Sequence, residues 1–192
     1  MSTKERRNSP MLIVHTGEGK GKTTAAMGIA LRGWAQSWNV GVYQFVKSGK
    51  WRTGEEAAFR ALDDAHRRDG VGGPVTWEHL GRGWTWSRPH ADQPLEAEEL
   101  ARIGWEHVRA QLAAERHDLL ILDEFTYPMA RGWVQTDDVL AHLRNRPGSQ
   151  HVVITGRGAP EKLVAAADLV TDMTKVKHPF DGGQRGQAGI EW

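Results

Sequence analysis

Residues 11–24 read MLIVHTGEGKGKTT, and they indicate the fold class more clearly than any other part of the sequence. Its apolar first half ends in a glycine cluster, and Thr23–Ser37 then carries apolar residues at helical spacing, so the pattern predicts a strand, a loop and a helix. Gly-Lys-Thr at such a junction is the core of a P-loop. There, glycines let backbone N–H groups face phosphate oxygens, Lys22 neutralises charge and the Thr23 hydroxyl can hold Mg²⁺. A glycine-rich turn beside a surface lysine is the alternative, but context and motif agree on the P-loop. The expected nucleotide-binding residues are Gly17, Glu18, Gly19, Lys20, Gly21, Lys22, Thr23 and Thr24.

This loop is one residue shorter than the standard pattern. Four residues normally separate the first glycine from Gly-Lys, whereas only Glu18, Gly19 and Lys20 separate Gly17 from Gly21. A shortened loop need not hold the β- and γ-phosphates where an ordinary NTPase holds them. Hydrolysis or phosphoryl transfer therefore does not follow from the motif, and the bond that breaks is open at this point.

Strands and helices alternate along the rest of the chain. Because the strands are continuous apolar runs, we expect a single-domain α/β fold of the P-loop NTPase-like (RecA-like) class, with a mainly parallel sheet and helices on both faces. The domain is expected to span residues 11–192, after a flexible N-terminal segment at residues 1–10. Further strands are predicted at Val40–Val46, Val75–Trp77, Leu119–Leu122, His151–Thr155 and Leu169–Met173, and further helices at Gly54–Leu62, Pro94–Glu115, Thr136–Asn145 and Pro160–Ala167.

Composition excludes several classes of protein. The 192 residues fit one domain. The formal net charge of +1 argues against a dedicated nucleic-acid binder, and the absence of cysteine excludes disulfides and thiolate chemistry. The charged first ten residues resemble no signal peptide, and apolar runs of four residues are too short for a membrane span. We therefore expect a cytoplasmic protein without nucleic-acid or membrane partners.

Polar residues at the ends of the predicted strands are further candidates, because ligands of parallel sheets bind beyond the carboxyl ends of the strands. Asp123 and Glu124 follow an apolar run, and one or both acids could hold Mg²⁺ or Mn²⁺ together with Thr23, from the end of a strand neighbouring the first. The alternative is that the two acids have no ligand and simply follow the end of a strand, which is common. Gln44 and Lys47 follow the second strand and are expected to bind the nucleotide, as is Arg157, which could meet phosphate or ribose or be simply solvated. No Asn-Lys-x-Asp sequence occurs, so ATP is expected rather than GTP.

Six blocks, taken together and in order, resemble the P-loop type of corrinoid adenosyltransferase. They are Thr16–Thr24, Gln44–Lys47, Gly83–Trp86, Leu122–Tyr127, Thr155–Gly158 and Val176–His178. The resemblance implies transfer of the 5′-deoxyadenosyl group of ATP to the cobalt(I) of a corrinoid, with release of triphosphate. It also implies that the triphosphate runs in the reverse sense to other P-loop proteins, so that C5′ faces the cobalt.

The resemblance also implies roles for Trp84 and Trp86. In the family, an aromatic pair in a Gly-aromatic-Thr-Trp motif packs on the lower face of the corrin and displaces an axial ligand, which makes cobalt(II) easier to reduce. Phe is more usual where Trp84 stands, although a large apolar ring should serve. The expected catalytic residues are thus Lys22, Trp84 and Trp86. On sequence alone, packing of a long loop onto the domain is the favoured interpretation of the two tryptophans, and only the surrounding blocks of the resemblance favour the corrin role instead.

The expected partners follow from the same resemblance. They are a corrinoid (cobalamin, cobinamide or a biosynthetic intermediate), a reduced flavoprotein as electron donor, and a second copy of the chain in a homodimer. Trp105, beside the apolar stripe of its helix, is expected at a subunit contact, while Trp34 and Trp38 are expected four apart on one helix, in packing or at an interface. His15 is expected to pack in the core. The rival interpretations are a P-loop kinase or ATPase, which would form ADP, and a non-catalytic carrier or sensor of ATP and corrinoid.

Overall fold

The computed structural model describes residues 9–46, 53–81 and 97–190. Within them one six-stranded sheet has the order β3-β2-β4-β5-β1-β6, and every pairing is parallel. The strands are β1 Leu12–Thr16, β2 Val40–Gln44, β3 Val75–His79, β4 Leu119–Asp123, β5 His151–Thr155 and β6 Leu169–Asp172. Parallel strands need a crossover between them, and the helices supply it. The predicted single-domain P-loop NTPase-like α/β fold is confirmed.

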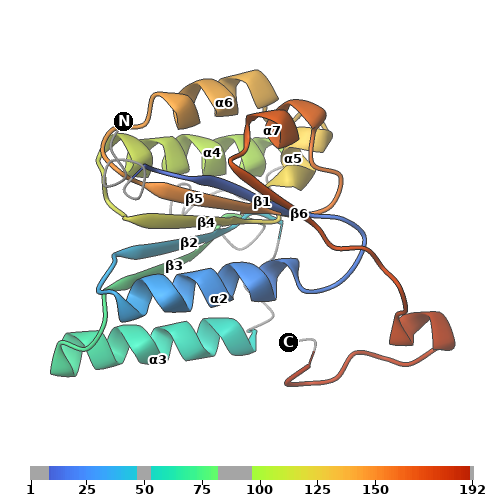
Figure 1. Ribbon diagram of the computed structural model, residues 1–192, viewed down its shortest axis with the longest axis horizontal. Helices are drawn as coiled ribbons and strands as arrows, with labels where there is room; N and C mark the ends of the chain where they lie inside the picture. The colour runs from blue at the N-terminus through green and yellow to red at the C-terminus, as the bar shows by residue number, and fades with distance from the viewer. Residues whose placement is uncertain (1–8, 47–52, 82–96, 191–192) are drawn as a thin grey trace, which may run out of the picture.

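Helices cover both faces of the sheet (Figure 1). On one face lie α2 Lys22–Ala35 and α3 Gly54–Asp69, and on the other α4 Ala97–Ala113, α5 Thr126–Ala130, α6 Thr136–Arg144 and α7 Glu161–Ala166. A short 3₁₀ helix, η1, at Pro179–Gly182 follows β6 in the exposed C-terminal segment. No helix of the described residues is both long and apolar enough to cross a bilayer.

Two apolar cores form because alternate strand residues face opposite helix layers. The core under α2 and α3 contains Val42, Ile121 and Val153 from the strands, packed against Met27 and Phe59. The larger core under α4, α6 and α7 takes the intervening strand residues, including Tyr43, Leu120 and Leu122. Both faces of the central strands are buried, which explains their uninterrupted apolar sequences.

Three local predictions are wrong. The helix predicted at Gly54–Leu62 continues to Asp69, because Thr53 caps its start, Asp63 pairs with Arg67 one turn later, and Gly70 with φ 68° ends it. Trp38 is not on the helix with Trp34, since α2 ends at Ala35; its ring stacks on His151 at 5.0 Å between ring centroids.

The third correction concerns the strand that carries Asp123. β4 does not neighbour β1, because β5 lies between them in the sheet. The three strands nevertheless end at one edge, since Val14 pairs with Ile154 and Ile154 pairs with Leu122. The end of β5 therefore lies between the P-loop and Asp123, and the side chain at that end matters for the site.

Candidate active site

The P-loop leaves β1 and folds tightly enough to bring the ammonium of Lys22 over its own backbone. Gly17 and Gly21 adopt φ values of 97° and 106°, which only glycine adopts at little cost. The Lys22 side chain turns back, so that its Nζ donates to Gly17 O at 2.7 Å and to Gly19 O at 2.6 Å. Burial lowers the pKa of Lys22, and the charge of Arg157 lowers it further, while Glu124 and other acids oppose the shift. The loop thus holds a cation at its centre.

The end of β6 closes one side of the same loop. Gly19 N–H donates to Met173 O at 2.5 Å, and Met173 N–H donates to Thr16 O at 2.9 Å. A Cβ on Gly19 would lie 2.6 Å from Met173 O and 2.8 Å from Thr174 O, both backbone atoms. The loop therefore needs glycine there because a second chain segment packs directly against it. One of its amides consequently faces a carbonyl in this structure.

Asp123, the last residue of β4, is fully buried, and the side chains of one P-loop residue and two strand-end residues donate hydrogen bonds to it. Thr23 Oγ donates to its Oδ1 at 2.8 Å, Thr155 Oγ donates to the same oxygen at 2.7 Å, and Gln44 Nε2 donates to Oδ2 at 2.9 Å. Burial of a carboxylate is costly unless hydrogen bonds such as these compensate it. The structure therefore brings the predicted residues Thr23, Asp123 and Gln44 together at the carboxyl edge of the sheet.

Glu124 lies next to this cluster in a strained backbone conformation. Its φ of 57° is uncommon for a residue with a side chain, and its N–H donates to Thr155 Oγ at 3.0 Å. Strain of this kind tends to gather at functional sites, where the surroundings over-determine it. The charge of the half-buried Glu124 raises the pKa of Lys22 and so opposes the effect of burial.

The remaining predicted nucleotide-binding residues differ in exposure. Arg157 is exposed and pairs with Glu18 of the P-loop at 3.2 Å, so the two lie on the same side of the loop. Lys20 and Thr24 are exposed, whereas Gln44 is only 1% exposed and both ends of its amide are hydrogen-bonded within the protein. Lys47, Trp84 and Trp86 lie outside the described residues.

An apolar pocket of about 180 Å³ opens at the same edge of the sheet. Residues following three strands line it, namely Phe45 and Val46 after β2, Gly81 after β3 and Tyr127 after β4, together with Leu100 of α4 and Trp133. Arg131 lies over the Tyr127 ring, 4.4 Å from its centroid, which adds a cation beside the pocket. Such a lining suits a small apolar ligand or an apolar part of a larger one.

The prediction that Trp105 is exposed at a subunit contact is wrong. The side chain is 3% exposed, stacks on Phe125 with 5.3 Å between ring centroids, and donates from Nε1 to Asp138 at 2.7 Å. Because the indole N–H finds an acid on α6, this tryptophan packs inside although it lies beside the apolar stripe. His15 is buried as expected, with Nδ1 3.3 Å from Lys22 O.

Sequence reasoning missed Thr155 and Met173. Thr155 ends β5 just as Gln44 ends β2 and Asp123 ends β4, so the strand-end criterion would have found it. Met173 acts through its backbone carbonyl, and no residue type announces such a role. The other unpredicted contact comes from Thr126, whose hydroxyl donates to Arg157 O at 2.7 Å and fixes the turn after β5.

Comparison with known proteins shows the family to which the chain belongs. The family described as ATP:corrinoid adenosyltransferase BtuR/CobO/CobP matches residues 8–192. A corrinoid adenosyltransferase of Pseudomonas aeruginosa is 39% identical over 95% of this chain and 83% of its own length. Corrinoid adenosyltransferase CobA of Salmonella typhimurium is also 39% identical, over 95% of this chain and 85% of its own.

A solved structure shares the fold at low identity. The flagellar accessory protein FlaH of Methanocaldococcus jannaschii superposes with a TM-score of 0.54 at 15% identity, over 89% of this chain and 76% of that chain. This likeness concerns the fold alone. The match along nearly the whole chain and the identity to the two named enzymes decide the family: the chain belongs to the ATP:corrinoid adenosyltransferases and is a transferase.

Proposed function

We propose that this protein transfers the 5′-deoxyadenosyl group of ATP to the cobalt(I) of a corrinoid and releases triphosphate intact. The observation that carries the proposal is the P-loop, which is one residue short and whose Gly19 N–H donates to Met173 O. A loop that offers fewer amides to phosphate, around a central Lys22, supports an unconventional path for the triphosphate. Family membership supplies the two substrates.

The reaction needs positioning and leaving-group stabilisation rather than a general base. The electron pair of cobalt(I) forms the Co–C5′ bond while the C5′–O bond breaks, and the bonding pair leaves with the triphosphate. No proton moves in this step. Lys22 and the loop amides stabilise the charge that develops on the leaving group. Consistent with this, His15 is buried and hydrogen-bonded at the P-loop backbone, away from any base role.

Thr23 and Asp123 fit a Mg²⁺ site in type and geometry. Their side-chain oxygens lie 2.8 Å apart, and hydroxyl and carboxylate oxygens are the ligands that Mg²⁺ prefers. Glu124 adds a second acidic side chain next to them. When bound, the ion would neutralise part of the triphosphate charge. Mn²⁺ has similar ligand preferences and is expected to substitute.

The apolar pocket of about 180 Å³ between Phe45 and Trp133 is too small for a whole corrin, but its aromatic lining supports contact with one part of the ring near the carboxyl edge of the sheet. A corrin is planar and apolar with amide groups at its rim, and Tyr127 and Trp133 present aromatic rings there. We extend the proposal to Trp84 and Trp86 as lower-face residues, to Lys47 and Arg157 as nucleotide ligands, and to a reduced flavoprotein as electron donor. The homodimer and the cytoplasmic location rest on the family resemblance and composition, since Trp105 no longer supports a subunit contact.

Product analysis tests the proposal. The protein is incubated with Mg²⁺, ATP and chemically reduced cob(I)alamin, and the products are separated by ion-exchange chromatography. We expect triphosphate and a light-sensitive alkylcobalt product in equal amounts. ADP with phosphate, or ADP with a phosphorylated corrinoid, would contradict the proposal and favour a kinase or ATPase. ATP and corrinoid binding without any product would favour a carrier or sensor.

A further inference from the structure

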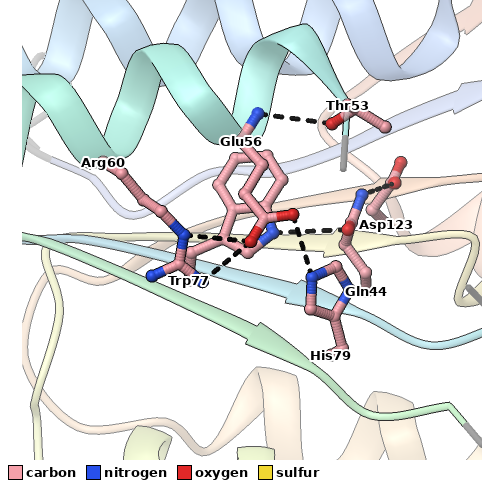
Figure 2. Close-up of polar contacts among 7 residues, drawn as sticks. All are labelled: Gln44, Thr53, Glu56, Arg60, Trp77, His79 and Asp123. Atoms are coloured by element: carbon pink, nitrogen blue, oxygen red, sulfur yellow. Dashed lines mark hydrogen bonds and ion pairs between the residues drawn. The ribbon is translucent and has the colours of Figure 1, made fainter. Parts of the chain in front are cut away.

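Gln44 links the edge strand β3 to the Asp123 carboxylate on β4 (Figure 2). Its Nε2 donates to Asp123 Oδ2 at 2.9 Å, and its Oε1 accepts from Trp77 Nε1 at 3.3 Å. Gln44 pairs in register with Asp123 on one side and His79 on the other, so Trp77 reaches it diagonally from two residues before the end of β3. The side chains of Trp77, Gln44 and Asp123 thus form a row across three strands.

The chemistry of the three groups fixes the orientation of the amide. An ionised carboxylate only accepts hydrogen bonds, and an indole N–H only donates. If the amide flipped, its oxygen would face the carboxylate and its NH₂ group would face the indole N–H, and both hydrogen bonds would be lost. Because the Trp77 N–H can only donate, it favours the orientation in which the Gln44 oxygen faces Trp77 and the Gln44 NH₂ group donates to Asp123.

A buried acid of α3, Glu56, lies beside this row and has partners of its own. Its Oε1 accepts from Arg60 at 2.7 and 3.0 Å, and its Oε2 lies 3.1 Å from His79 Nε2. Figure 2 shows this second group beside the first, with separate partners. Phe59 packs on the Trp77 ring with 5.9 Å between centroids. The indole is therefore held in place by packing while its N–H serves Gln44.

We propose that Gln44 and, through it, Trp77 are positioning residues for the Asp123 carboxylate. They fix its Oδ2, while Thr23 and Thr155 fix its Oδ1, so that the carboxylate is held in one orientation before metal and ATP arrive. This inference rests on the proposed function in taking Asp123 as the carboxylate of the metal–nucleotide site. Neither Gln44 nor Trp77 touches the substrate in this role, which differs from the ligand role expected of Gln44 from its sequence position.

Mn²⁺ and ATP binding without corrinoid tests the inference. Affinity is measured by titrating Mn²⁺ and ATP into the wild type and three variants, Trp77→Phe, Gln44→Met and the double variant. Trp77→Phe keeps an aromatic ring, removes the N–H and leaves a small cavity, which the Trp105→Phe control described below also creates. We expect about threefold weaker binding, as for one long neutral hydrogen bond. Gln44→Met leaves the buried carboxylate one donor short, and we expect a loss of roughly tenfold or more.

The double variant separates an indirect role from a merely structural one. If Trp77 acts through Gln44, the double variant binds as weakly as Gln44→Met and no more weakly. Losses that multiply would overturn the inference, as would wild-type affinity in Trp77→Phe. In the metal-free protein, we expect the Trp77 indole N–H to exchange with solvent faster in Gln44→Met than in the wild type. Unchanged exchange would mean that the hydrogen bond does not hold the indole.

Trp105→Phe is the matched control. It also removes an indole N–H donor from a buried tryptophan, in this case one that serves Asp138 away from the site. We expect lower thermal stability and unchanged Mn²⁺–ATP affinity in Trp105→Phe. If Trp105→Phe weakened Mn²⁺–ATP binding as much as Trp77→Phe does, the loss would come from general destabilisation of the fold, and the inference would be overturned. Because no corrinoid is present, these results stand whether or not adenosyl transfer occurs, and failure of the transfer assay alone would count against the proposed function only.

Discussion

Replacing Lys22 with methionine tests the central cation of the P-loop. Its Nζ lies 2.7 and 2.6 Å from the Gly17 and Gly19 carbonyls, at the position from which it would meet the triphosphate. Methionine keeps the length of the side chain and removes the charge and all donors. One charge-assisted hydrogen bond contributes about 2 kcal/mol, or about a thirtyfold change in ATP affinity. Because charge grows on the leaving group, we expect kcat/KM for adenosyl transfer to fall roughly a hundredfold or more.

The assay follows the absorbance change of cob(I)alamin on alkylation at saturating Mg²⁺ and ATP, and ATP binding is measured separately. Lys162→Met is the control, since it removes an exposed lysine that pairs with Asp137 on the surface, where ion pairs contribute little. We expect that control to match the wild type. A Lys22→Met enzyme whose kcat/KM stays within threefold of the wild type would refute the assigned role of the loop.

Three further predictions concern the corrin site, the turn after β5 and stability in acid. Alanine at Trp84 or Trp86 should slow the reaction from cob(II)alamin far more than from prereduced cob(I)alamin, as measured with both starting materials. Gly156→Ala should lower the free energy of unfolding by about 2 kcal/mol, because φ is 137° and a Cβ would lie 2.2 Å from Thr126 Oγ. Burial lowers the pKa of His117 to about 4, whereas unfolded histidine titrates near 6.5, so the unfolded chain binds the proton first. Stability should therefore fall as pH drops through this window, by about 3 kcal/mol in full, as measured by urea unfolding.

Each of these has a matched comparison. Equal losses on the two cobalamin routes would argue against displacement of an axial ligand. Gly158→Ala has a positive φ of 60° but open space, so it should cost only about 1 kcal/mol, and a loss equal to that of Gly156→Ala would rule out the contact as the cause. His117→Gln should flatten the dependence of stability on pH, and an unchanged slope would assign it to other groups.

The order and type of most elements could be predicted because each carries a local pattern. The P-loop strand, the apolar run before Asp123 and the helix at Thr136–Arg144 all follow from spacing and end signals within a short window. The order of strands in the sheet could not be predicted this way, since the placement of β5 between β1 and β4 depends on long crossovers rather than on neighbouring residues. The five-residue helix α5 was missed because Pro128 stands in its middle and five residues are too few to show a helical period.

The residues of the candidate site that lie at strand ends or in a motif could be predicted from the sequence. The contacts that depend on the register between strands could not. Thr23 and Asp123 were found by motif and meet as expected. That Gln44 donates to Asp123 while accepting from Trp77 depends on which residues of β2, β3 and β4 lie opposite one another. The burial of Trp105 likewise depends on Asp138 of a different helix.

The most direct test of the account follows one oxygen atom. ATP is prepared with ¹⁸O in the bridge between C5′ and the α-phosphorus and is allowed to react with cob(I)alamin on the protein. Attack of cobalt at C5′ breaks the carbon–oxygen bond, so mass spectrometry should find the ¹⁸O in intact triphosphate and none in the adenosyl product. Release of the label with the nucleoside, or its retention in ADP, would show that a phosphorus–oxygen bond breaks instead and would contradict the account.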